Sequence, residues 1–254
     1  MHQPAIYPGL AGKTVFITGG GSGIGAAITT GFAGQKAKPA FVDIAEAPSR
    51  DLVAQLKRET GVEPLYIPCD IRDIGALQAA IERTRAELGD IAVLVNNAAN
   101  DDRHSVEQVT PEYWDDRMAI NLRPSFFAAQ AVLPQMKRLG GGSIINFGSI
   151  SWMATQGNFP AYATAKAAAH GLTRTLARDF GPFGIRVNCV VPGWVMTERQ
   201  RRLWLTPELD EARAKAQCLP AQVDPEDLAD MVLFLASDAS AKCSARDFYV
   251  DGGR

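Results

Sequence analysis

Residues 13–25 read KTVFITGGGSGIG, and this stretch decides the fold. Lys13–Thr18 is a short apolar run typical of a buried strand, and a helix is expected to start at about Gly23. The glycines between them allow a tight turn and a close approach of the backbone to a pyrophosphate. The free N–H groups at the start of the helix favour the phosphate charge. A strand, a glycine loop and a helix in this order predict a dinucleotide-binding unit.

The rest of the chain continues the alternation of strands and helices. Six more strands are predicted at Pro39–Ile44, Pro64–Cys69, Ile91–Asn96, Gly142–Gly148, Ile185–Val191 and Phe248–Val250. Helices are predicted at Ala76–Leu88 and Tyr162–Phe180. A third helix is predicted to start at Thr110-Pro111, with Thr110 as its cap. Several strands are apolar on both faces, as expected when helices cover both sides of a parallel sheet. We therefore predict an α/β fold in which residues 1–254 form a single domain, a Rossmann-type doubly wound parallel sheet of about seven strands.

The bulk composition excludes several classes of protein. The 254 residues carry a net charge of −2 from 26 basic and 28 acidic side chains, which gives no reason to expect nucleic acid or an anionic membrane as partner. No apolar run approaches the roughly 18 residues of a spanning helix, and the first ten residues lack the pattern of a signal peptide. The cysteines are far apart and form no C-x-x-C pair, so we expect free thiols, no metal site and a cytoplasmic protein. They are Cys69, Cys189, Cys218 and Cys243.

Asp43 indicates which dinucleotide is bound. It ends the second predicted strand, about 20 residues after the glycine loop, where an acid accepts hydrogen bonds from the ribose hydroxyls of NAD. Its charge would repel the 2′-phosphate of NADP. No Arg or Lys stands in Ile44-Ala45 or inside the glycine loop. The sequence therefore favours NAD over NADP.

Several motifs follow one another along the chain, namely T-G-x-x-x-G-x-G at 18–25, Asn96-Asn97-Ala98-Ala99, Asn121, Ser149, Tyr162-x-x-x-Lys166 and Pro192-Gly193 with Thr197. With these motifs in this order, the chain resembles the short-chain dehydrogenase/reductase family from Leu10 to Gly253. The resemblance implies an NAD-dependent oxidoreductase. Ala99 and Lys36 depart from it, since the family usually has glycine at both positions.

The resemblance implies four catalytic residues. Tyr162 is the expected base, but a free tyrosine has a pKa of about 10. Lys166 shares a helical face with Tyr162, and its charge stabilises the phenolate and lowers that pKa. By resemblance, Lys166 also holds the nicotinamide ribose, Ser149 positions the reacting oxygen, and Asn121 anchors a water that connects Lys166 to solvent.

The same resemblance implies the cofactor contacts. They are Gly19, Ser22, Gly23, Ile24, Gly25, Asp43, Ile44, Asp70, Ile71, Asn97, Ala98, Ala99, Tyr162, Lys166, Pro192, Gly193, Val195 and Thr197.

Within the family, the chain is most similar to bacterial sugar 1-dehydrogenases, which oxidise aldoses such as D-xylose or D-galactose to lactones. The stretches that carry this likeness are 100–104, 141–152, 191–200, 217–219 and 251–254. Aromatic rings can cover the apolar C–H face of a sugar. The substrate contacts expected from this are Asn100, Ser149, Trp152, Asn158, Tyr162 and Trp194. His104 lies in a polar loop, where we expect a solvated side chain.

Three further expectations concern helices. The charged segment Arg199–Gln217 is expected to belong to a substrate lid at about 194–220. Pro124 cannot donate to the carbonyl of Ile120, so we predict a helix break beside Asn121 that leaves carbonyls free to hold water. By resemblance, the helices that carry Asn121 and Tyr162 form a homo-oligomer, for which we favour a tetramer.

Other functions stay open at this point. The same site could act on another secondary alcohol or ketone, such as a polyol, a steroid or an acyl compound. A non-catalytic dinucleotide-binding regulator is also conceivable, although such a protein would be expected to lack Tyr162, Lys166 or Ser149, and all three are present. The fold alone does not separate these functions.

Overall fold

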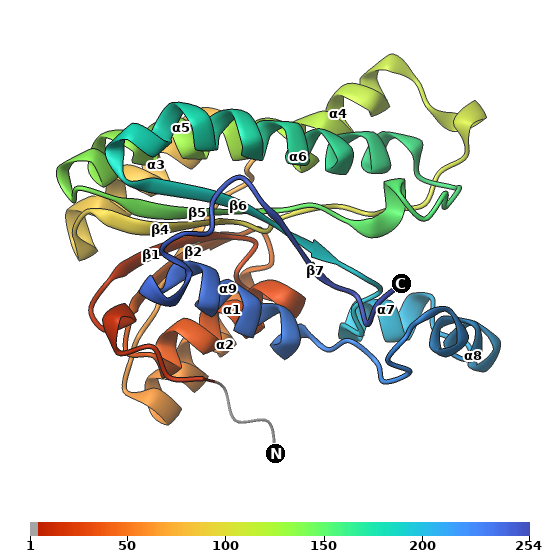
Figure 1. The fold of residues 1–254 in the computed structure, drawn as a ribbon, viewed down its shortest axis with the longest axis horizontal. Coiled ribbons are helices and arrows are strands. Elements are labelled where there is room, and N and C mark those ends of the chain that lie inside the picture. Colours follow the sequence, from red (N-terminus) through yellow and green to blue (C-terminus); the bar gives the residue numbers. More distant parts are fainter. Residues whose placement is uncertain (1–4) are drawn as a thin grey trace.

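A seven-stranded parallel sheet forms the centre of the molecule, as predicted (Figure 1). The computed structural model describes residues 5–254. The strand order is β3-β2-β1-β4-β5-β6-β7. The strands are β1 Thr14–Thr18, β2 Lys38–Asp43, β3 Leu65–Pro68, β4 Ile91–Asn96, β5 Gly142–Phe147, β6 Ile185–Pro192 and β7 Asp247–Val250. Each of the seven predicted strands is therefore present, with ends within one or two residues of the prediction.

Helices cover both faces of this sheet. One layer holds α1 Gly23–Gly34, α2 Glu46–Thr60 and α9 Pro225–Ala236. The other holds α3 Ile74–Leu88, α4 Pro111–Asn121, α5 Arg123–Arg138 and α6 Pro160–Phe180. Two short helices, α7 Glu198–Leu203 and α8 Pro207–Ala216, stand beyond the carboxyl end of the strands (Figure 1). Single 3₁₀ turns occur at η1 Pro8–Leu10, η2 Val106–Gln108, η3 Ile150–Trp152, η4 Gly181–Phe183 and η5 Asp238–Ser240.

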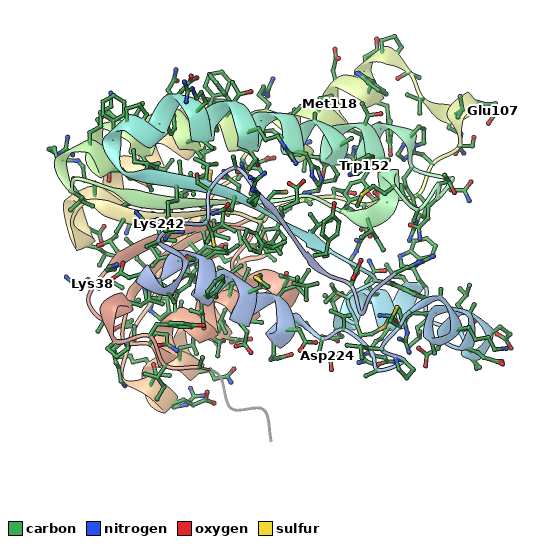
Figure 2. The ribbon with its side chains drawn as sticks, viewed as in Figure 1. Lys38, Glu107, Met118, Trp152, Asp224 and Lys242 are labelled. Carbon is green, nitrogen blue, oxygen red and sulfur yellow. The ribbon has the colours of Figure 1, made fainter. Side chains whose placement is uncertain are left out.

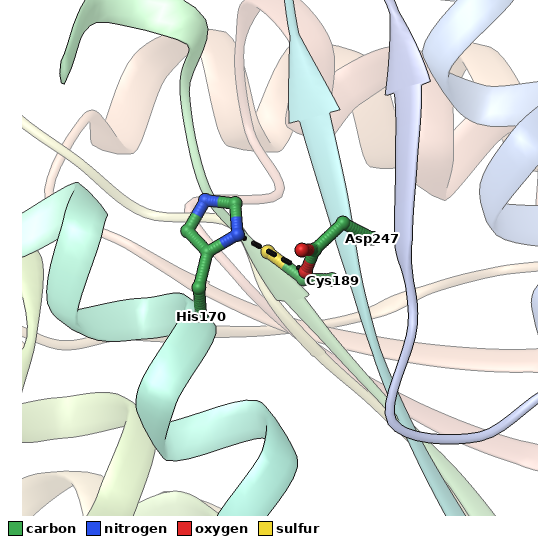
Figure 3. A group of neighbouring side chains, drawn as sticks. All are labelled: His170, Cys189 and Asp247. Atoms are coloured by element: carbon green, nitrogen blue, oxygen red, sulfur yellow. Dashed lines mark ion pairs between the residues drawn. The ribbon is translucent and has the colours of Figure 1, made fainter. Parts of the chain in front are cut away.

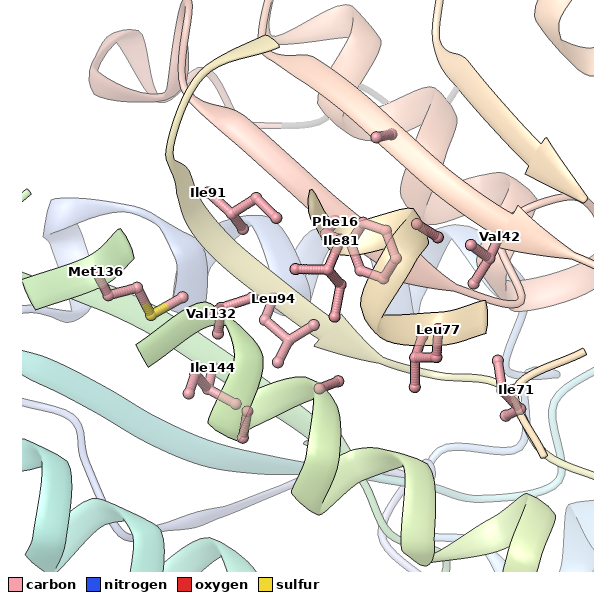
Figure 4. Packing of buried hydrophobic residues seen from close by; sticks show 14 of the residues in the cluster. Phe16, Val42, Ile71, Leu77, Ile81, Ile91, Leu94, Val132, Met136 and Ile144 are labelled. Carbon is pink, nitrogen blue, oxygen red and sulfur yellow. The ribbon is translucent and has the colours of Figure 1, made fainter. Parts of the chain in front are cut away.

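Two apolar clusters, one on each face of the sheet, explain why the central strands are apolar throughout. Phe16 and Leu94 point toward α3 and α5, where they meet Ile81 and Val132 (Figure 4). Val15, Ile17 and their neighbours pack against α1 and α9 on the opposite face. All five residues of β1 are buried. A strand with both faces covered leaves no position at which a polar residue would reach water.

The strand order places a crevice at the carboxyl ends of β1 and β4. β1 pairs with β2 on one side and with β4 on the other, so the chain leaves these strands in opposite directions. Ligands of doubly wound sheets bind at such a switch point. The glycine loop follows β1 and the segment from Asn97 follows β4, so both motifs lie at this crevice.

The predicted helix break beside Asn121 is present. α4 ends at Asn121 and α5 begins at Arg123, and Leu122 between them has φ −136° and ψ −56°. Ser125 donates to the carbonyl of Leu122 rather than to that of Asn121. The missing N–H of Pro124 explains the break, because it removes the donor that the carbonyl of Ile120 would use.

Lys36 adopts a backbone conformation that favours glycine, with φ 59°. For a side chain with a Cβ, this left-handed conformation costs about 1–2 kcal/mol. Lys36→Gly should therefore raise the free energy of unfolding by about 0.5–1 kcal/mol after the greater backbone entropy of glycine is included. Thermal denaturation followed by circular dichroism should show a higher Tm.

Lys38→Gly is the matched control, because Lys38 begins β2 at the opposite end of the molecule from α7 and α8 (Figures 1 and 2). Glycine weakens a strand, so this variant should lower the Tm. A decrease of the Tm in Lys36→Gly as well would contradict the role of backbone strain at Lys36.

Candidate active site

A cavity of about 1200 Å³ opens at the carboxyl ends of the strands. It extends from the glycine loop, past the ends of β2 and β4, to Tyr162 on α6 and to α7 and α8. The predicted cofactor residues line it, with the exception of Gly23. Of the predicted catalytic and substrate residues, Asn121 and Trp152 lie outside the lining. The fold therefore brings together most of the candidate residues from distant parts of the sequence.

Hydrogen bonds connect the two loops of the crevice. The hydroxyl of Thr18 accepts from the backbone N–H groups of Asn97 and Ala98, each at 3.1 Å. The side-chain amide of Asn97 donates in return to the carbonyls of Thr18 and Gly19, at 3.1 and 3.0 Å. A Cβ on Gly19 would lie 2.9 Å from the Cα of Ala98, so the approach of the two loops requires glycine there. Asn97 is thus a structural clamp as well as a lining residue.

The start of α1 has the features of a phosphate site. Ser22 is the N-cap residue, and its side chain makes no capping hydrogen bond, so it leaves the first N–H groups of the helix available. Ser22, Ile24 and Gly25 line the cavity at this point. Free amides and the positive end of a twelve-residue helix fit the pyrophosphate of a dinucleotide.

Asp43 lies at the end of β2 with both carboxylate oxygens in use. Oδ2 accepts from the N–H of Gly21 and Oδ1 accepts from the N–H of Ala45, both at 2.9 Å. A carboxylate offers about four acceptor positions, so each oxygen can accept one more hydrogen bond. These contacts fix the carboxylate at the cavity wall. Arg72 also lines the cavity, but its guanidinium is paired with Asp70 and Asp116.

The catalytic candidates meet where β5 ends and α6 begins. Ser149 directly follows the carboxyl end of β5, and Tyr162 and Lys166 lie one turn apart on α6. The ammonium of Lys166 donates to the carbonyl of Phe147 at 2.9 Å and lies 5.8 Å from the centre of the Tyr162 ring. The Ser149 side chain is near enough to Tyr162 to lower the pKa of its phenol. The predicted trio is therefore assembled.

Burial works against the charged forms of both Tyr162 and Lys166. Loss of solvent raises the pKa of Tyr162 to about 12, and the charge of Asp101 adds to this rise. The hydrogen bond from Ser149 and the charge of Arg103 act in the opposite direction. Loss of solvent also lowers the pKa of Lys166 to about 8. In the protein alone, Tyr162 is thus a protonated phenol at neutral pH.

Asn121 is buried behind the cavity and holds the loop after β4. Its Oδ1 accepts from the N–H of Asn100 at 2.9 Å. Its Nδ2 donates to the carbonyls of Asn100 and Arg117, at 3.2 and 3.0 Å. Both amide hydrogens are therefore engaged, and Oδ1 and one of them hold the backbone of Asn100, which lines the cavity. The water predicted beside Asn121 remains a prediction.

Trp152 lies on η3 and is directed away from the cavity. Its indole N–H donates to Nε2 of His170 at 3.2 Å, and Nδ1 of His170 lies 3.0 Å from a carboxylate oxygen of Asp247 (Figure 3). The carboxylate of Asp247 also pairs with Arg174. Trp152 is 42% exposed and lies outside the cavity lining, contrary to the predicted contact with the substrate.

His170, Asp247 and the thiol of Cys189 form a compact group of potential metal ligands, all within 4.8 Å of one another (Figure 3). Because Nε2 of His170 accepts the indole N–H, the ring proton resides on Nδ1 and is donated to Asp247. Burial raises the pKa of the Cys189 thiol to about 12, so it keeps its proton. His170 and Asp247 thus belong to a hydrogen-bonding network that also includes Trp152 and Arg174.

The expectation of a solvated His104 is wrong. The side chain is buried, and its Nδ1 lies 2.9 Å from both the Tyr113 hydroxyl and the carbonyl of Asp102. Its Nε2 accepts from the N–H of Ala161 at 3.3 Å. Its backbone N–H donates to the carbonyl of Asn158 at 2.7 Å. The polarity of the surrounding sequence suggested exposure, whereas the ring joins this loop to the start of α6.

Residues of the predicted lid close one side of the cavity. Arg199 on α7 pairs with Asp101 and Asp102 of the loop after β4. Gln200 donates to Asp101 at 2.8 Å and accepts from the indole N–H of Trp194 at 3.0 Å. The segment 194–220 is thus connected to the opposite wall by charged and polar contacts. Its movement as a lid remains a prediction.

Several lining residues were not anticipated from the sequence. They are Arg103, Arg117, Gln156, Trp204, Leu209, Arg213 and Arg254, among others. Arg117 lies on α4, whereas Trp204, Leu209 and Arg213 belong to the predicted lid segment and the others lie on loops. A tertiary arrangement, not a local pattern, brings them to the cavity.

The comparisons with known proteins agree with this geometry. Residues 19–254 match a family model described as enoyl-(acyl carrier protein) reductase. The chain is 51% identical over 249 residues to a D-xylose 1-dehydrogenase of Caulobacter vibrioides, with 98% of each chain covered. It is 49% identical over 247 residues to a probable galactose dehydrogenase of Rhizobium meliloti, covering 97% of this chain and 96% of the relative. The chain therefore belongs to the short-chain dehydrogenase/reductase family.

Solved structures show the same fold. A 7α-hydroxysteroid dehydrogenase complexed with NADH superposes with a TM-score of 0.91 at 31% identity, over 96% of this chain and 94% of the other. An L-sorbose reductase of Gluconobacter frateurii complexed with NADPH and L-sorbose gives 0.90 at 28% identity, over 98% of both. The neighbours thus include complexes with either dinucleotide. Among residues 5–254, no helix is both long and apolar enough to cross a membrane.

Lys166→Met should stabilise the fold while it abolishes turnover. The pKa of Lys166 is lower in the folded chain, about 8, than the 10.5 of an exposed lysine. Burial of the charge therefore lowers the free energy of unfolding by its full amount below pH 8. This destabilisation decreases as the pH rises from 8 to 10.5, because the lysine loses its charge in the folded chain first. Methionine removes the charge at similar size, so the Tm at pH 7 should rise by about 5 °C.

The gain should shrink when Tm is measured at pH 9 and above. Lys57→Met is the control, because Lys57 is an exposed lysine on α2 paired with Glu63. It should change the Tm little at either pH. A lower Tm for Lys166→Met at pH 7 would show that its hydrogen bond to Phe147 outweighs the cost of burying the charge.

Proposed function

We propose that this protein is an NAD-dependent aldose 1-dehydrogenase that oxidises C1 of a sugar to the lactone. One observation carries the proposal, namely that Ser149, Tyr162 and Lys166 converge in the cavity that the glycine loop and Asp43 also line. The names of the two curated relatives, at 51% and 49% identity, support a sugar substrate. The polar groups around the site, such as Asn100 and Asn158, suit a substrate rich in hydroxyls.

Tyr162 is the proposed base of the reaction. When bound, NAD supplies the hydride acceptor and a positive charge beside the phenol. The Tyr162 hydroxyl must act as phenolate, and Lys166 stabilises that form because its ammonium lies near the ring. Ser149 holds the reacting oxygen next to the phenol, and the phenolate takes its proton as the carbonyl forms.

We further propose that the proton leaves through Lys166 and the break between α4 and α5. The amide of Asn121 is occupied by Asn100 and Arg117, so it cannot itself anchor a water through free donors. The carbonyls of Ile120 and Asn121 face no helical donor across the break. These carbonyls are the proposed anchors of a water that connects Lys166 to solvent.

The protein is also proposed to be a cytoplasmic homotetramer. Trp114 on α4 and Phe126 on α5 are large apolar side chains that are 37% and 42% exposed. Exposed apolar side chains of this size favour contact with another subunit. The four cysteines are unpaired, which is in keeping with a reducing compartment.

The test of the activity is NADH formation at 340 nm with a panel of aldoses, polyols and steroids. Turnover of one aldose by the wild type should fall at least about 10²-fold in Tyr162→Phe, because the base is lost. NAD affinity should change little, which binding by fluorescence would check.

Turnover of a polyol or steroid but of no aldose would keep the mechanism and overturn the substrate class. The steroid arm matters because one structural neighbour is a hydroxysteroid dehydrogenase. NAD binding without turnover of any substrate would favour a regulator.

Asp43→Asn tests the preference for NAD. The variant keeps the shape of the side chain but removes the charge that would face a 2′-phosphate. The ratio of kcat/KM for NAD to that for NADP should fall at least about tenfold, equivalent to about 1.4 kcal/mol. Asp51→Asn, an exposed acid on α2, should leave the ratio unchanged. An unchanged ratio in Asp43→Asn would contradict the assigned role of Asp43.

A further inference from the structure

Arg103 occupies a distinctive position at the cavity wall. Its guanidinium lies between two aromatic rings, with its central carbon 4.4 Å from the centre of the Phe159 ring and 5.2 Å from that of Trp204. Phe159 directly precedes α6, whereas Trp204 directly follows α7. Arg103 therefore spans the space between the catalytic helix and the segment opposite, and it lines the cavity.

The guanidinium of Arg103 is not engaged by any acid. Arg103 is exposed and, within residues 5–254, makes no hydrogen bond or ion pair, so its N–H groups are free to bind a ligand. The adjacent acids have other partners. Asp101 binds Arg199 and Gln200, and Asp102 pairs with Arg199. Other arginines of the cavity wall, such as Arg213, are held by carboxylates.

The backbone around Arg103 is fixed. The neighbouring His104 is buried, and its ring and its N–H bond to Ala161 and Asn158. The loop that carries Arg103 is therefore attached directly to the start of α6. A long side chain on an anchored backbone, stacked between two rings, loses less freedom when it binds a ligand.

The distance to the reacting end suits a single sugar ring. The Phe159 ring that contacts Arg103 lies 5.8 Å from the Tyr162 ring, centre to centre. A sugar whose C1 lies at Tyr162 would thus extend its far hydroxyls toward Arg103. The planar guanidinium presents parallel N–H donors, which match two neighbouring oxygens.

We propose that Arg103 binds a pair of neighbouring hydroxyls on the aldose, on the side away from C1, and thereby determines which sugars are accepted. The inference rests on the proposed function, because it names the part of the sugar that this residue recognises. Phe159 and Trp204 act as positioning residues that hold the guanidinium in place. Arg103 then contributes to selectivity and orientation rather than to proton transfer.

The experiment compares the preferred aldose with its monodeoxy analogues in the wild type, Arg103→Gln and Arg103→Lys. The wild type should discriminate against the analogues that lack a contacted hydroxyl by about tenfold or more in kcat/KM. In Arg103→Gln that discrimination should fall to near one for those analogues and stay unchanged for the others. Arg103→Lys should be intermediate, because it keeps the charge but loses the paired donors.

Arg202→Gln is the matched control, because Arg202 is an exposed arginine of α7 outside the cavity lining. This variant should leave the ratios of kcat/KM between the aldose and its analogues unchanged. Equal losses of kcat/KM for the aldose and all analogues in Arg103→Gln would overturn the recognition role. So would a wild-type preference for a uronic acid over the parent aldose, which would make Arg103 a carboxylate site.

These results are distinct from failure of the proposed function. If the wild type oxidises no aldose, the sugar dehydrogenase activity and the Arg103 proposal both fall. If it oxidises an aldose and Arg103→Gln leaves every ratio unchanged, only the Arg103 proposal falls. NAD binding, measured by fluorescence, should be the same in all variants and confirms that they are folded.

Discussion

The hydrogen bonds between the end of β1 and the end of β4 are the constraint on which the rest of the site depends. The hydroxyl of Thr18 accepts two backbone N–H groups, and the amide of Asn97 returns two donors to the first loop. These bonds fix how far the two loops separate at the switch point of the sheet. The phosphate-binding start of α1 and the loop that carries Asn100 and Arg103 are consequently held in one frame. The glycine at position 19 lets the two loops approach this closely.

Within that frame, loss of solvent shifts the ionisation of the two titratable groups at the reacting end. Burial moves the pKa values of Tyr162 and Lys166 toward their neutral forms. The protein alone therefore does not generate the phenolate, and in the proposed mechanism the positive charge of a bound oxidised cofactor would stabilise it. This arrangement couples the basicity of Tyr162 to occupation of the cavity. It also means that the buried Lys166 is a local cost to folding that packing elsewhere offsets.

Local patterns explain why so much of the fold could be predicted. The strands are short apolar runs between turn residues, and Pro124 marks the break beside Asn121 by its missing donor alone. The family motifs likewise placed Ser149, Tyr162 and Lys166 in one cavity, because each lies at a strand end or on one helical face. What could not be predicted depends on loops. Neither the buried ring of His104 nor the guanidinium of Arg103 has a sequence pattern that reveals its partners.

Trp152 was predicted to contact the substrate, but it lies outside the cavity lining. Its position next to an active-site strand suggested contact with a sugar, yet the ring turns toward α6 and donates to His170. The direction in which an isolated aromatic side chain points is set by the partners that satisfy its polar edge. The partner here is His170 on α6, which is itself held by Asp247 on β7.

The network around His170 has a consequence for how this protein can evolve. A Cβ on Gly148, the residue before Ser149, would lie 2.7 Å from Nε2 of His170 and 3.0 Å from the sulfur of Cys189. A larger residue at position 148 therefore requires a smaller side chain at position 170 or at position 189. Positions 148, 170 and 189 should consequently vary together across related sequences, as one inherited unit.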